Sequence, residues 1–141
     1  MKLLGCSFNK ISAEKIKNIQ EELKINSNIN IISIEKANSD MFKAKDEDLF
    51  SIRFKYTIDY EPGFALVEIE GGLAISLNYK QGKELLKKWK DNQQIPEEIK
   101  IPLFNIILQK SSIKALQLED DLGFPFHIPF PRLTKQENKG N

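Results

Sequence analysis

The sequence predicts an α+β domain in which a four-stranded antiparallel sheet with bulges is followed by a short and a long helix packed on one face. A change of pattern along the chain carries this prediction. Apolar residues recur at every second position in the first half, which is typical of strands, and at helical spacing after Lys80. The 141 residues contain no internal repeat and no linker long enough to divide them. We therefore expect one domain over residues 1–133 and a polar, disordered tail over residues 134–141.

The first two expected strands each contain a change of parity. The residues on either side of the change are Leu4, Cys6 and Phe8 and then Ile11 and Ala13 in the first strand, and Ile29 and Ile31 and then Ile32 and Ile34 in the second. One inserted residue changes the parity of a strand, so we expect a β-bulge near Asn9-Lys10 and the same switch in the second strand.

The third and fourth strands are expected to form a hairpin. The alternating apolar residues are Phe50, Ile52, Phe54, Tyr56, Ile58 and Tyr60 in the third strand, and Val67, Ile69, Leu73, Ile75 and Leu77 in the fourth. Between them, Glu61-Pro62-Gly63 suggests a type II turn, and so short a connection requires antiparallel pairing. The Gly71-Gly72 pair interrupts the fourth strand, where we expect a bend.

Two helices are expected to follow. Lys83 to Asp91 carries apolar residues at helical spacing, and a second helical pattern runs from Pro96 to a natural stop at Gly123. Pro102 cannot donate a helical hydrogen bond, so it predicts either a kink or a fresh helix start. The segment Phe124 to Pro131 contains three prolines and must be extended.

Composition narrows the class of protein. Lysine and arginine number 21 and aspartate and glutamate number 20, so the net charge of +1 provides no field to steer nucleic acid or an anionic membrane. No apolar run is long enough to span a bilayer, and only Met1 and Lys2 precede the run that starts at Leu3, which is too little for a signal peptide. The lone Cys6 excludes an intrachain disulfide and is consistent with a reducing compartment. We expect a cytoplasmic protein.

No catalytic constellation is visible in the sequence. His127 is the only histidine and lies far along the chain from Cys6, so we interpret both as residues without a catalytic role. Gly82-Lys83 lacks the remaining residues of a phosphate-binding loop. The run Glu119-Asp120-Asp121 is expected to be exposed at a helix end. We therefore expect no enzyme, no cofactor and no metal, although a site built from scattered carboxylates stays open as a third hypothesis.

Apolar residues in two otherwise unstructured segments need another explanation. They are Phe42, in a polar stretch, and Phe124, Phe126, Ile128 and Phe130, in the proline-rich segment. Either these side chains complete the core of their own domain or they form a surface for a partner. We take them as candidate residues for binding polypeptide clients.

The order of these elements resembles that of SecB and SecB-like chaperones. Val67 to Ile75, with Gly71-Gly72, is similar to a glycine-interrupted strand of that family. Pro96 to Ala115 resembles the long helix of that family, which begins with a proline-containing apolar run. The corresponding run here is Ile101-Pro102-Leu103-Phe104. Pro125 to Leu133 resembles the proline-bearing segment that follows that helix.

The resemblance implies an ATP-independent holdase that binds unfolded or precursor polypeptides, as in protein export, and that forms a dimer or tetramer. Other family members shield the antitoxin of a toxin–antitoxin pair, and this chain would be an archaeal or a toxin–antitoxin-associated member. The chain is neutral where the bacterial export chaperone is acidic, and Lys135 to Asn141 has no Cys or His for that protein's small zinc site. Handover to the translocation motor SecA is therefore not implied. The alternative is an assembly or interaction subunit with one dedicated protein partner.

Overall fold

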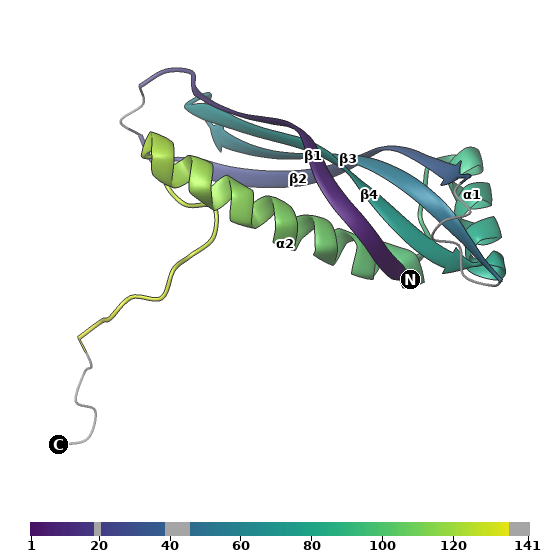
Figure 1. The fold of residues 1–141 in the computed structure, drawn as a ribbon. Helices are drawn as coiled ribbons and strands as arrows, with labels where there is room; N and C mark the ends of the chain where they lie inside the picture. Colours follow the sequence, from purple (N-terminus) through teal and green to yellow (C-terminus); the bar gives the residue numbers. More distant parts are fainter. Residues whose placement is uncertain (19–20, 39–45, 136–141) are drawn as a thin grey trace.

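The computed structural model describes residues 1–18, 21–38 and 46–135. Its elements are β1 (Lys2–Lys15), β2 (Lys24–Ala37), β3 (Glu47–Glu61), β4 (Ala65–Asn78), α1 (Tyr79–Asn92) and α2 (Glu97–Leu122). In Figure 1, α2 runs along the length of the sheet and α1 lies at one end of it. The predicted α+β class, with four strands followed by a short and a long helix, is confirmed.

The sheet is antiparallel throughout and has the order β1-β4-β3-β2. The predicted hairpin of β3 and β4 occupies its centre. The two edges are therefore β1 and β2, which follow each other in the sequence. Directly after β1 the chain lies against the end of the central hairpin, where the N–H groups of Ile16 and Lys17 donate to the carbonyl oxygen of Phe64.

The bulges predicted from the parity changes are confirmed. The pairing of β1 with β4 shifts between Phe8 and Lys10, and the pairing of β2 with β3 shifts between Ile31 and Ser33. A further shift between Leu3 and Gly5 was not predicted. Adjacent apolar residues at the start of β1 hide any change of parity there, so alternation carries no signal.

The turn between β3 and β4 differs from the expected type II turn. Gly63 has the positive φ expected of it, at 78°. However, the closing hydrogen bond runs from the N–H of Phe64 to the carbonyl of Tyr60, and the Glu61–Pro62 peptide is cis. The hydrogen-bonded loop is therefore one residue wider than that of a β-turn.

Gly71 and Gly72 do not interrupt β4, so that expectation was wrong. Both residues are paired with β1 on one side and with β3 on the other. A Cβ atom on Gly71 would lie 2.5 Å from the carbonyl oxygen of Ser7 and 2.9 Å from Cζ of Phe54. Glycine is needed here for the close approach of neighbours, and β4 continues through it.

Both helices pack on the same face of the sheet. In β3 and β4 the predicted alternating residues point to this face and are buried. They meet Leu85 of α1 and Ile99, Leu103 and Ile107 of α2 in one cluster, and a second cluster surrounds Ala115 farther along α2. The other face of β3 carries mostly exposed or half-buried polar residues.

Helix α2 continues through Pro102, so the alternative of a fresh helix start was wrong. Its buried residues are spaced by four: Ile99, Leu103, Ile107, Ser111, Ala115 and Glu119. A four-residue step exceeds one helical turn by about 40°, so the buried stripe winds around α2 as the helix follows the sheet. Ile101 and Ile113 lie opposite the local stripe and are exposed.

Candidate functional site

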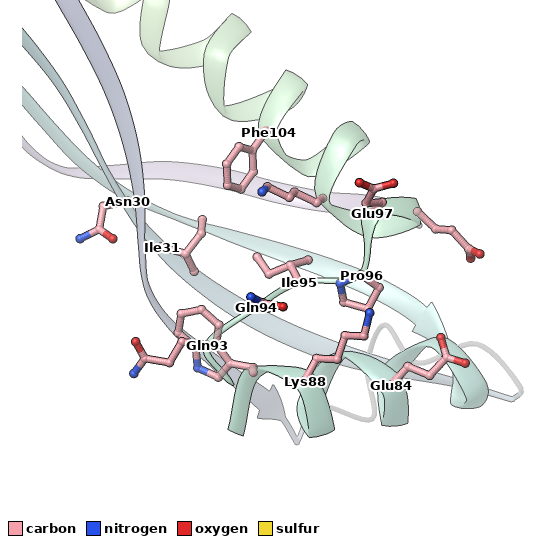
Figure 2. A pocket seen from close by; sticks show the side chains of 13 residues that line it. Asn30, Ile31, Glu84, Lys88, Gln93, Gln94, Ile95, Pro96, Glu97 and Phe104 are labelled. Carbon is pink, nitrogen blue, oxygen red and sulfur yellow. The ribbon is translucent and has the colours of Figure 1, made fainter. Parts of the chain in front are cut away.

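A hollow of about 850 Å³ opens where α1, the α1–α2 connection, the start of α2 and the middle of β2 meet (Figure 2). The lining residues are Asn30, Ile31, Glu84, Lys88, Trp89, Gln93, Gln94, Ile95, Pro96, Glu97, Glu98, Lys100 and Phe104. We call this hollow the groove. It takes one wall from the edge strand β2 and the other walls from the helices, so only the tertiary fold creates it.

Four apolar side chains in the lining of the groove are partly buried against the core. They are Ile31, Trp89, Ile95 and Phe104, all of which are half-buried and pack against the first core cluster. Trp89 is one helical turn beyond the buried Leu85, so its ring emerges at the edge of the core. Helix α1 ends at Gln93 in the left-handed conformation, and this reversal brings Ile95 back toward β2.

Charged side chains of both signs surround the apolar part. Glu84 and Lys88 come from α1, and Glu97, Glu98 and Lys100 come from the first turn of α2. The two α2 acids lie at the positive end of the helix dipole, which stabilises them there. The Lys100 Nζ atom lies 5.5 Å from the centre of the Phe104 ring, within range of a cation–π interaction. Half-buried apolar side chains among polar and charged ones suit binding of an extended peptide.

A second polar cluster lies under the end of α2, where exposure was expected. Glu119 is completely buried, and its Oε2 atom accepts hydrogen bonds from the Tyr60 hydroxyl and from the His127 backbone N–H. Its Oε1 atom lies 2.7 Å from Nδ1 of His127. Because Glu119 is the acceptor, we assign the ring proton of His127 to Nδ1.

Burial, together with the hydrogen bond to Glu119, raises the pKa of the Tyr60 phenol above its ordinary value. The expected exposure of Glu119 was wrong because the four-residue stripe of α2 turns this position toward the sheet. Its neighbours Asp120 and Asp121 are exposed, as expected. The cluster binds the segment after α2 to the domain through His127.

The structure separates the candidate client-binding residues. Phe124 is buried and contacts the rings of Tyr60 and Phe64, so it completes the domain's own core. Phe126, Ile128 and Phe130 are exposed, and the rings of Phe126 and Phe130 contact each other. They lie beyond the end of α2, whereas the groove lies at its start (Figure 1). Phe42 lies outside the described residues.

Cys6 and His127, considered for nucleophilic catalysis, are not brought together. Cys6 is half-buried in β1, and burial raises the pKa of its thiol, partly offset by nearby Lys110. His127 contacts Glu119 and Tyr56 instead. Within residues 1–18, 21–38 and 46–135, no three His, Cys, Asp or Glu side chains are grouped to hold a metal ion. No helix in this part of the chain is long and apolar enough to cross a membrane.

The groove residues were not identified as a site from the sequence. Trp89 and Phe104 follow the helical spacing that also places core residues, so periodicity alone does not show that they are half-exposed. The signal that could have found the groove is the short connection between the helices, where Ile95 and Pro96 follow two glutamines. Only the packing of α1 beside β2 brings Ile31 to the same place.

The described chain has the fold of a SecB-like chaperone. It is similar to the solved structure of a SecB-like chaperone from Mycobacterium tuberculosis in complex with a ChAD peptide from an antitoxin. The TM-score is 0.52 at 11% sequence identity, and the match covers 94% of this chain and 89% of that one. No family model and no curated protein matches the sequence.

Proposed function

We propose that this chain is an ATP-independent chaperone of the SecB-like family that holds unfolded polypeptide segments in the groove between β2, α1 and the start of α2. The observation that carries the proposal is the group of half-buried apolar side chains in an open groove, on a fold shared with a SecB-like chaperone. The proposal involves no catalysis and places the protein in the cytoplasm.

The groove has the properties that a tolerant peptide site needs. Trp89 and Phe104 offer aromatic surface, which contacts side chains of many shapes without demanding one sequence. Both aromatic rings rest on the core, so they are held in place before a client arrives. The edge strand β2, which contributes Ile31, also has main-chain groups available to an extended segment, and such hydrogen bonds carry no sequence preference.

The outer surface of α2 supports self-association. Ile101 and Ile113 are more than half exposed on a helix whose inner side is already packed against the sheet. Apolar groups that a soluble protein leaves exposed in this way commonly mark a partner surface. We therefore propose a homo-oligomer, a dimer or a tetramer, in which these residues are covered by another copy.

A dedicated partner is the second candidate function. The similar M. tuberculosis protein was solved with a peptide from an antitoxin, which is a defined partner. The same groove would then select one segment, and its charged rim would contribute to the selection. The two functions differ in the range of clients.

The test is suppression of aggregation with several unrelated denatured proteins, in the absence of nucleotide. We expect the wild-type chain to protect all of them, and Phe104→Ser to weaken client binding about tenfold or more because a buried ring loses about 1.5–3 kcal/mol of transfer energy. Ile95→Ser, outside both helices, provides a second groove variant. Ile16→Ser is the matched control because Ile16 is exposed after β1, beside the turn that carries Phe64.

Thermal unfolding of each variant separates loss of binding from loss of fold. Protection of only one protein among many would favour the dedicated partner. A monomer that protects none of them, or groove variants that fold and protect as well as Ile16→Ser does, would refute the proposal.

A further inference from the structure

The segment after α2 is held at its beginning and free afterwards. Phe124 is buried, and the side chain of His127 is 3% exposed beside Glu119. We call residues 128–135, which follow this anchor, the arm. In Figure 1 the chain leaves the domain at the end of α2 and points away from the sheet.

The arm carries apolar side chains that its own domain does not cover. Ile128 and Phe130 are 41% and 54% exposed, and Leu133 is fully exposed. Pro129 and Pro131 lack N–H groups and keep the arm extended, so it loses little conformational entropy on binding. Such a segment has the character of a ligand, an extended peptide with apolar anchors.

The arm cannot reach the groove of its own chain with these anchors. Phe104, in the groove, precedes Glu119 on α2 by 15 residues, which is about 22 Å along the helix axis. Phe130 follows the anchor at His127 by three residues, which span at most about 11 Å. Leu133 would reach Phe104 only if the chain ran straight back along α2, whereas it leads away from the helix.

We propose that the arm binds in the groove of a second copy of this chain, with Phe130 as its main anchor, and so competes with clients. The inference rests on the groove of the proposed function and assigns it an internal ligand. A groove that is empty of client would be covered by an arm, which limits the apolar surface that the free chaperone exposes.

The charges of the two surfaces are complementary. The arm contains Arg132 and Lys135 and no acidic residue. The rim of the groove contains Glu84, Glu97 and Glu98. The rim also contains two lysines, so its acidic residues outnumber its basic residues. One of these lysines, Lys100, lies over the Phe104 ring. The groove therefore favours a basic apolar segment such as the arm.

The first experiment titrates a fluorescent peptide of residues 126–135 against the full chain by anisotropy. A chain that carries both Ile128→Ser and Phe130→Ser should bind the peptide more tightly than wild type, because its own arm no longer competes with the peptide. A chain that carries both Glu97→Lys and Glu98→Lys should bind the peptide about tenfold more weakly than wild type does. Glu21→Lys with Glu22→Lys is the matched control, since these exposed adjacent acids precede Asn30 in β2 by eight or more residues.

A charge exchange tests the orientation of the arm. A peptide with Arg132→Glu should lose about threefold to tenfold in affinity for the wild-type chain and recover it on the Glu97→Lys, Glu98→Lys chain. Circular dichroism confirms that each chain is folded. Equal binding of the peptide to the groove variant and the control variant, or no recovery on charge exchange, would overturn the inference.

Binding of a denatured client, measured on the same chains, distinguishes the two proposals. If clients bind in the groove and the arm peptide does not, the arm has no role there and the chaperone function stands. If the arm peptide binds in the groove and no client does, the groove is a site for self-association and the chaperone function fails.

Discussion

Replacement of Glu119 is expected to be among the most damaging changes to stability. The carboxylate is fully buried and accepts hydrogen bonds from the Tyr60 hydroxyl, the His127 ring and the His127 backbone N–H. Glu119→Leu keeps the volume but leaves these donors without an acceptor in a buried place. Breaking a buried polar pair on one side costs about 3–5 kcal/mol, which is a large part of the stability of a domain of this size.

Urea unfolding followed by circular dichroism measures this loss. With a slope of about 2 kcal/mol per molar urea, the midpoint should fall by about 2 M. Asp120→Leu is the matched control because Asp120 is the adjacent acid and is exposed, so its replacement should change stability by less than about 0.5 kcal/mol.

A triple variant tests the physical reason. Tyr60→Phe, Glu119→Leu and His127→Leu together remove the side-chain donors along with their acceptor, so most of the loss should be recovered. If Glu119→Leu costs no more than Asp120→Leu, or if the triple variant is as unstable as the single one, the cluster does not stabilise the fold in the way described.

Two further perturbations test the close approach in β4 and the titration of Tyr60. Gly71→Ala should destabilise the chain by about 1–3 kcal/mol, because its Cβ would lie 2.5 Å from a backbone oxygen. Gly72→Ala should reduce stability less, because its Cβ would lie 3.6 Å from the nearest backbone oxygen. Equal urea midpoints of the two variants would contradict this. The raised pKa of Tyr60 means that its contribution to stability is complete below its unfolded pKa of about 10 and is lost as the pH rises toward the folded pKa. Between about pH 9 and 11 the unfolded phenol gives up its proton while the folded phenol keeps it. The free energy of unfolding of wild type should therefore fall with rising pH relative to that of Tyr60→Phe, and a parallel pH dependence of the two chains would refute this.

Much of the fold followed from local patterns in the sequence. Alternation over Phe50 to Tyr60 identified β3 and its buried face, and the parity changes located two of the three register shifts. Gly123 marked the end of α2. These features were predictable because side-chain period and backbone conformation are properties of neighbouring residues.

Other features were decided only by tertiary structure. Glu119 looked like one of three exposed acids, and its burial depends on how far the stripe of α2 has turned when it meets Tyr60, a residue 59 positions away. Phe124 and Phe130 have similar sequence surroundings, yet the first is in the core and the second is exposed. The groove unites Ile31 of an edge strand with Trp89 of a helix. Local pattern shows that a side chain is apolar, but which neighbours cover it is set by contacts between distant segments.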